Sequence, residues 1–181
     1  GWDGFEIAVR AVLGQQVSVA AARTLATRIV QRYGAAPHAP LPDGLHRLFP
    51  TPVQLADADL REIGVTTARA ATIRGIAQAL LDGRVNFRPE QPLQDFVAHW
   101  VGLPGIGEWT AHYIAMRALS HPDAFPAADL ILRRAAAGDA PELSTKALTA
   151  LAEAWRPWRA YAVIHLWRST GDVATAKRSK C

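Results

Sequence analysis

A five-residue run near the middle of the chain constrains its fold more than any other feature. The run is Leu103-Pro104-Gly105-Ile106-Gly107, and it stands directly before the apolar-periodic segment that starts at Glu108. Glycine permits the positive φ of a tight turn, and the first N–H groups of a following helix can bind an anion. The run therefore predicts a hairpin between two helices that holds a phosphate without reading a base sequence.

Helical periodicity dominates the rest of the chain, so we predict an all-α fold. Asp3 and Ser18 are placed to cap the first two helices, and Asp59 and Gly64 to open and close a short one. Connections rich in proline or polar residues near 35–50 and 84–92 are predicted as lobe junctions. The expected helices cover residues 3–13, 19–33, 52–56, 60–63, 67–82, 93–100, 108–119 and 130–137.

Composition excludes several classes of protein. Half of the 181 residues are apolar, which is enough for a core, and the single cysteine is the last residue, Cys181. A disulfide framework and a cysteine metal cluster are thus excluded. The six histidines form no H-x-x-x-H pair, so no metal site built from side chains is predicted. No apolar run reaches membrane-spanning length, and we expect a soluble, cytoplasmic protein.

The positive charge lies at one end of the chain. Residues 153–181 carry six basic and two acidic side chains, which accounts for the whole net charge of +4. A basic end predicts a polyanionic partner. The alternative is a solvated tail that keeps the protein in solution.

Three groups of polar or aromatic residues are candidates for function. Asp129 precedes the helix expected at 130–137, where it would act either as a simple N-cap or as a reactive carboxylate. Trp109 and Tyr113 are four residues apart and share one helix face, either in the core or in a base pocket. Gln15 and Gln16 lie in the turn between the first two helices, where they are either polar turn residues in contact with solvent or residues that bind a partner.

Four motif blocks in order resemble the helix-hairpin-helix base-excision DNA glycosylases. The blocks are the hairpin 103–107, Phe125-Pro126-Ala127-Ala128-Asp129, the segment 11–18 and the segment 155–162. Together they are similar to the alkylpurine branch, 3-methyladenine DNA glycosylase II, over the range from about Phe5 to Trp167. The resemblance implies a two-lobed helical fold. It also implies that an N-terminal lobe of the family is missing from residues 1–181.

The resemblance assigns roles to individual residues. Asp129 matches the catalytic aspartate, and Gln16, with Gln15 beside it, matches the side chain that fills the gap left by a flipped nucleotide. A glutamine at position 16 departs from the apolar wedge of the alkylpurine enzymes. The base pocket would comprise Trp109, Tyr113 and Trp158. No cofactor is required, although backbone carbonyls of Val101, Leu103 and Ile106 could hold a monovalent cation.

Position 109 carries a further implication. Relatives that also cut the DNA backbone have a lysine there, which forms a Schiff base, whereas this chain has tryptophan. We therefore expect a monofunctional glycosylase that hydrolyses the N-glycosidic bond of alkylated purines, of the 3-methyladenine and 7-methylguanine type, in base excision repair. Its partner would be duplex DNA with a damaged base, bound by a monomer. The alternatives are a non-catalytic DNA-binding module and a glycosylase for oxidised or mismatched bases.

Overall fold

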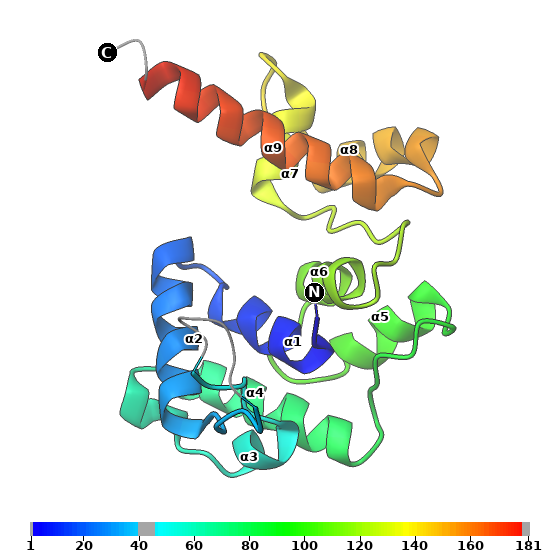
Figure 1. The fold of residues 1–181 in the computed structure, drawn as a ribbon. Helices are drawn as coiled ribbons and strands as arrows, with labels where there is room; N and C mark the ends of the chain where they lie inside the picture. The colour runs from blue at the N-terminus through cyan, green and yellow to red at the C-terminus, as the bar shows by residue number, and fades with distance from the viewer. Residues whose placement is uncertain (1, 40–45, 179–181) are drawn as a thin grey trace.

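The computed structural model describes residues 2–39 and 46–178, with side chains of the last helix described as far as residue 170. This part of the chain contains helices and turns but no strand, which confirms the all-α prediction (Figure 1). The α-helices are α1 (Gly4–Leu13), α2 (Val19–Tyr33), α3 (Pro52–Ala56), α4 (Thr67–Leu81), α5 (Leu93–Val101), α6 (Glu108–Ala118), α7 (Leu130–Ala137), α8 (Thr145–Ala152) and α9 (Arg159–Arg178). Two 3₁₀ helices, η1 (Leu60–Ile63) and η2 (Glu153–Trp155), complete the order.

The predicted caps are in place. The Asp3 carboxylate accepts the N–H of Glu6 at 2.7 Å, and the Ser18 hydroxyl accepts the N–H of Ala21 at 3.2 Å. Each side chain satisfies one of the N–H groups that a helix start leaves unpaired. Gly64 ends η1 with a φ of 90°, a conformation that glycine adopts without strain.

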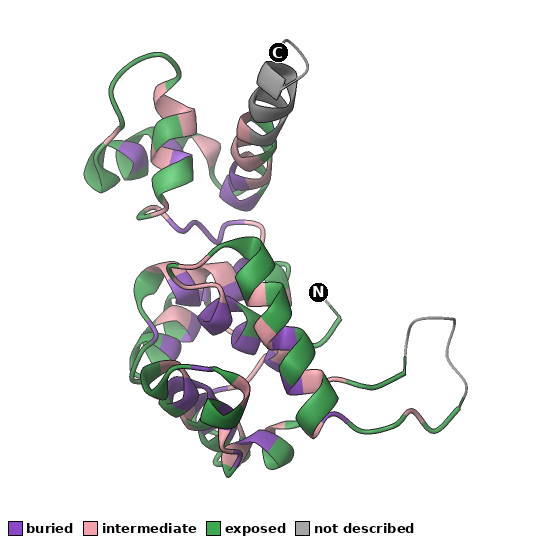
Figure 2. Ribbon diagram, turned by 90° about the vertical axis from the view of Figure 1, so that its left-hand side faces the viewer, coloured by how far each residue is buried: buried purple, intermediate pink, exposed green. Residues whose placement is uncertain are grey.

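The helices form two groups, which we call the larger lobe (α1–α6) and the smaller lobe (α7–α9). In the larger lobe, α1 packs on α4 and α6, α5 packs on α6, and α3 packs on α4. Figure 2 shows that buried residues gather on the inner sides of the helices of this lobe. Phe96 and Trp100 of α5 are fully buried. In the smaller lobe, α7 packs on both α8 and α9.

The chain passes from the larger to the smaller lobe through residues 119–129 (Figure 1). The connections predicted as lobe junctions, 35–50 and 84–92, instead join α2 to α3 and α4 to α5 within the larger lobe. Helices α8 and α9 were not expected from the sequence. The segment 119–129 therefore links the two lobes and carries Asp129 at its end.

None of the helices in the described residues is long and apolar enough to cross a membrane. The basic end predicted to attract a polyanion has six basic residues, of which Lys177, Arg178 and Lys180 have side chains outside the described residues. Two of the other three, Arg156 and Arg159, form ion pairs with Asp123.

Candidate active site

The hairpin joins α5 to α6 and is anchored by its apolar residues. Leu103 and Ile106 are buried, while Pro104, Gly105 and Gly107 are exposed. Gly105 has a φ of 86°, and a Cβ there would lie 2.0 Å from the Thr72 hydroxyl of α4. Gly105 is thus required both by the turn and by the close approach of α4.

Gly107 differs from Gly105. It is the N-cap of α6, it has no side chain to accept the first N–H groups of the helix, and a Cβ there would meet no atom within 4 Å. The packing of the protein therefore does not explain this glycine. The first turn of α6 presents bare N–H groups, and with them the positive end of the helix dipole, at the surface.

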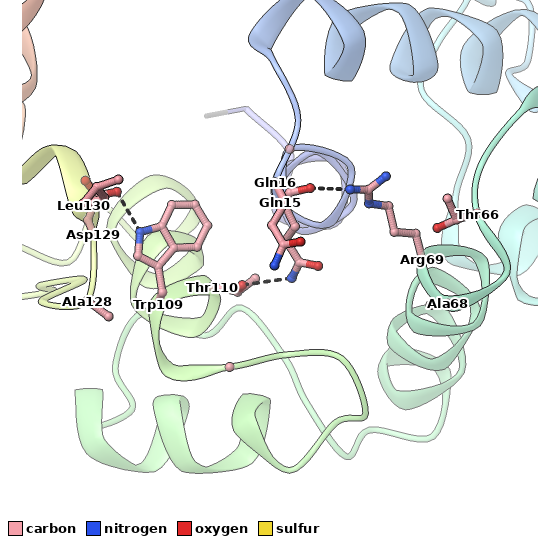
Figure 3. Close-up of a pocket in the computed structure, with 12 residues that line it drawn as sticks. Gln15, Gln16, Thr66, Ala68, Arg69, Trp109, Thr110, Ala128, Asp129 and Leu130 are labelled. Atoms are coloured by element: carbon pink, nitrogen blue, oxygen red, sulfur yellow. Dashed lines mark hydrogen bonds between the residues drawn. The ribbon is translucent and has the colours of Figure 1, made fainter.

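A cleft of about 800 Å³ lies between the hairpin, the α1–α2 turn, the start of α4 and the start of α7. Figure 3 shows Gln15, Arg69, Trp109 and Asp129 around it. The residues that line it are Gly14, Gln15, Gln16, Thr66, Ala68, Arg69, Gly107, Trp109, Thr110, Ala128, Asp129 and Leu130. The fold thus brings the hairpin, the predicted gap-filling turn and the predicted catalytic carboxylate to one surface.

The two glutamines of the α1–α2 turn differ in their surroundings. The Gln15 amide donates to the Gly105 carbonyl at 3.2 Å and to the Thr110 hydroxyl at 3.1 Å, while Arg69 donates to the Gln15 carbonyl. Gln16 is exposed and has a φ of 54°, a conformation that is uncommon outside glycine. Gln15 therefore ties the turn to the hairpin, whereas Gln16 is the glutamine whose side chain is exposed.

Asp129 caps α7, and several N–H groups fix its carboxylate. Oδ1 accepts the N–H of Leu132 at 2.9 Å and the indole N–H of Trp167 at 3.3 Å, and Oδ2 accepts the indole N–H of Trp109 at 2.8 Å. A carboxylate offers about four lone-pair positions, so these three bonds leave acceptor capacity. Asp129 is half-buried and lines the cleft while it caps α7. The N-cap role therefore does not remove the carboxylate from the cleft.

An aromatic stack adjoins this carboxylate. The rings of Trp109 and Tyr113 stack with centroids 5.3 Å apart and planes 15° apart, and Trp167 lies 6.2 Å from Tyr113. Trp158 is not in this group: it is 57% exposed, and its ring lies edge-on to Tyr161. Trp167, which sequence reasoning missed, occupies the place expected of Trp158. The sequence showed only that a tryptophan stands at position 167. Because no helix was predicted after residue 158, the direction of this side chain could not be inferred.

Comparisons with known proteins show what this chain is similar to. The sequence is 44% identical over 165 residues to the probable bifunctional transcriptional activator/DNA repair enzyme AlkA of Mycobacterium tuberculosis, covering 91% of this chain and 33% of that protein. It is 36% identical over 173 residues to DNA-3-methyladenine glycosylase 2 of Escherichia coli, covering 93% of this chain and 58% of that protein. The chain thus spans less than two thirds of either relative.

The fold is also that of a solved glycosylase. The 3-methyladenine DNA-glycosylase from Archaeoglobus fulgidus superposes with a TM-score of 0.77 at 27% identity, over 92% of this chain and 57% of that chain. Residues 9–160 match the family described as HhH-GPD superfamily base excision DNA repair protein. The resemblance seen in the four motif blocks is confirmed, and the chain belongs to the HhH-GPD superfamily of base excision DNA repair proteins.

Proposed function

We propose that this chain binds duplex DNA that contains an alkylated purine and hydrolyses the N-glycosidic bond of that base without cutting the backbone. The observation that carries the proposal is the Asp129 carboxylate, held by the Trp109 indole at 2.8 Å at the wall of a cleft bordered by an aromatic stack and the hairpin. We also propose that the protein acts as a monomer in the cytoplasm, associated with the nucleoid through DNA.

Asp129 would act on the sugar. Cleavage of the N-glycosidic bond moves electrons to the base and leaves positive charge on the sugar, so a nearby carboxylate stabilises the transition state more than the ground state. The donors on Asp129 fix its orientation before the substrate arrives. The same oxygen atoms can orient or deprotonate the attacking water.

The aromatic stack would bind the base. A target base must leave the duplex before any side chain reaches its glycosidic bond. An alkylated purine such as 3-methyladenine carries positive charge, which the electron-rich ring faces attract by about 0.5–2 kcal/mol. Trp109, Tyr113 and Trp167 offer such faces next to Asp129. Because a cationic base leaves readily, this arrangement requires little acid catalysis.

The hairpin and the α1–α2 turn would hold the DNA. The bare N–H groups at the start of α6 suit a phosphate, and exposed Gln16 suits the gap left in the duplex. The carbonyl of Leu103 accepts the N–H of Ile106 at 3.1 Å and keeps a second lone pair. Such carbonyls are hard oxygen donors, so Val101, Leu103 and Ile106 fit the monovalent cation proposed for the hairpin.

The lack of backbone cutting rests on position 109. A Schiff base with the opened sugar requires an amine nucleophile. Tryptophan occupies position 109, and no lysine is among the residues that line the described cleft. Incubation with DNA that contains an abasic site, followed by borohydride reduction, should trap no covalent complex and should leave the strand intact.

The test of the proposal is base release from methylated duplex DNA, with the released base identified. Asp129→Asn should abolish release but keep DNA binding, because asparagine still caps a helix and accepts hydrogen bonds. Asp139→Asn, the same change at an exposed acid after α7, should behave like the unmutated protein. Salt-sensitive DNA binding without any release would favour the non-catalytic module instead, and release confined to oxidised or mismatched bases would favour the other glycosylase branch.

A further inference from the structure

His112 lies on α6 between the two residues of the aromatic stack, yet it faces away from the cleft. It is absent from the residues that line the cleft and instead lines a second cavity of about 200 Å³. Phe125, Ala127 and Ala128 line the same cavity. This cavity therefore lies directly behind the segment that carries Asp129.

The imidazole of His112 contacts the backbone of that segment. Its Nδ1 accepts the N–H of Phe125 at 3.3 Å. Phe125 is buried, so its N–H has no access to bulk water and depends on this acceptor. Phe125 stands four residues before Asp129, and the contact joins α6, which carries Trp109, to the segment that carries its partner carboxylate.

Further contacts hold the same segment to the smaller lobe. Arg159, at the start of α9, donates to both carboxylate oxygens of Asp123 and lies 5.7 Å over the Phe125 ring. The N–H of Ala160 donates to the Pro122 carbonyl at 2.8 Å.

From α6 in the larger lobe, the Ala115 carbonyl accepts the N–H of His121 at 3.2 Å at the start of the segment, and Trp109 binds Asp129 at its end. His112 supplies the contact between these two, so it fixes the middle of the segment relative to the aromatic stack.

This contact requires one form of the histidine ring. An imidazole that accepts at Nδ1 is neutral and carries its proton on Nε2, whereas the protonated ring donates at both nitrogens. A protonated ring would therefore point a donor at the Phe125 N–H. Charged and titratable groups around the ring are Glu108 of α6, His121 and Asp123 of the segment, Arg156 directly after η2, and Arg159 at the start of α9. Thr145 and Thr149 of α8 and Gln94 of α5 complete the surroundings.

Burial and the charge of Arg159 lower the pKa of His112, and Glu108 and Asp123 oppose this effect without reversing it. The ring is therefore neutral at neutral pH, and the contact with Phe125 is present.

We propose that His112 is a positioning residue, whose neutral imidazole holds residues 121–129 against α6 so that Asp129 stays beside Trp109, and whose protonation releases that segment. The inference rests on the proposed function, because its consequence for activity is read through base release. The inference adds His112 to the residues that base release depends on, although His112 would contact neither the base nor the sugar.

The test compares His112→Asn with His112→Leu. Asparagine offers a carbonyl oxygen that accepts the Phe125 N–H and does not titrate, whereas leucine offers no acceptor. We expect His112→Leu to slow single-turnover base release by roughly ten- to a hundredfold with little change in DNA affinity, because the hairpin is untouched. His112→Asn should restore most of the rate at neutral pH. His99→Asn, the same change at an exposed position of α5, is the matched control.

The pH profile separates positioning from mere packing. Between about pH 8 and pH 5 the unmutated protein should lose base release more steeply than His112→Asn, which lacks the titrating ring. The proposal would be overturned if the rate of base release fell equally with decreasing pH in the two proteins, or if His112→Leu left that rate unchanged.

Nitrogen NMR of the histidine rings gives a readout independent of activity. Nδ1 of His112 should be unprotonated and Nε2 protonated at neutral pH, and a proton on Nδ1 would refute the contact. If the unmutated protein releases no base, the proposed function fails, and the NMR result still decides whether the contact exists.

Discussion

At the scale of single residues, each oxygen of the Asp129 carboxylate receives a different indole N–H. Trp109 donates to Oδ2 at 2.8 Å, and Trp167 donates to Oδ1 at 3.3 Å. Replacing either tryptophan with phenylalanine keeps an aromatic face but removes the donor. A hydrogen bond to a charged group contributes about 1.5–3 kcal/mol, so Trp109→Phe should slow single-turnover base release roughly tenfold or more. Trp167→Phe, with the longer bond, should have the smaller effect.

Trp158→Phe separates the structural placement from the one expected from sequence. Trp158 is 57% exposed and pairs with Tyr161, away from Asp129. Trp158→Phe should therefore slow base release less than Trp109→Phe or Trp167→Phe does. A larger loss for Trp158→Phe than for Trp167→Phe would return Trp158 to the base pocket and contradict the arrangement described above.

At the scale of elements, the two hairpin glycines serve different ends and should respond differently to alanine. Gly105→Ala forces a side chain against Thr72 at a φ of 86°, so it should lower the melting temperature of the protein. Gly107→Ala meets no protein atom, so it should leave the melting temperature nearly unchanged. Because a methyl group at the start of α6 would meet a bound phosphate, Gly107→Ala should nevertheless weaken DNA binding.

The measurements for the hairpin pair are thermal unfolding and the affinity for duplex DNA at two salt concentrations. Gly138→Ala is a useful third variant, since its φ is 60° but a Cβ there also meets no atom within 4 Å. It isolates the cost of backbone conformation from that of close contact. Unaltered DNA affinity in Gly107→Ala would exclude the hairpin as the phosphate site.

At the scale of the whole molecule, the helices up to α7 could be predicted from the sequence, whereas α8 and α9 could not, for a physical reason. Asp3, Ser18 and Gly64 each begin or end the nearest helical turn, so the helix boundaries that they set can be predicted from neighbouring residues alone. Helix α9 has no single apolar stripe, and it packs through scattered residues such as Ala160 and Val163. The place of Trp167 depends on how α9 crosses α7, which is a long-range property. Asp129 could be found by motif as the candidate catalytic residue, whereas its second indole partner, Trp167, could not.

The link between the lobes depends on a buried ion pair. Arg159 and Asp123 have side chains that are 8% and 13% exposed, and Arg159 donates to the two carboxylate oxygens at 2.6 and 2.8 Å. Removing one partner of a buried pair costs about 3–5 kcal/mol. Asp123 keeps its bond to Arg156 when Arg159 is replaced, so the cost of Arg159→Met should lie near the lower end of that range. The melting temperature should then fall by roughly 6–12 °C. Arg61→Met, which breaks the exposed pair with Asp59, is the control and should change little.

Stability of the whole chain should also depend on pH through its histidines. Burial lowers the pKa of both His112 and His121 below the ordinary value of 6.5. Below pH 6.5 the unfolded chain therefore binds protons that the folded chain does not, so the free energy of unfolding falls as the pH decreases toward the folded pKa values. Further losses of stability are expected at lower pH, where two carboxylates become protonated: Glu153, whose pKa Arg156 lowers from 4.5, and Asp59, whose pKa Arg61 lowers to about 2. Urea midpoints measured from pH 8 to pH 5 should decline in the unmutated protein and less in a His112→Asn/His121→Asn variant. Equal slopes for the two proteins would mean that neither imidazole is kept neutral by the fold.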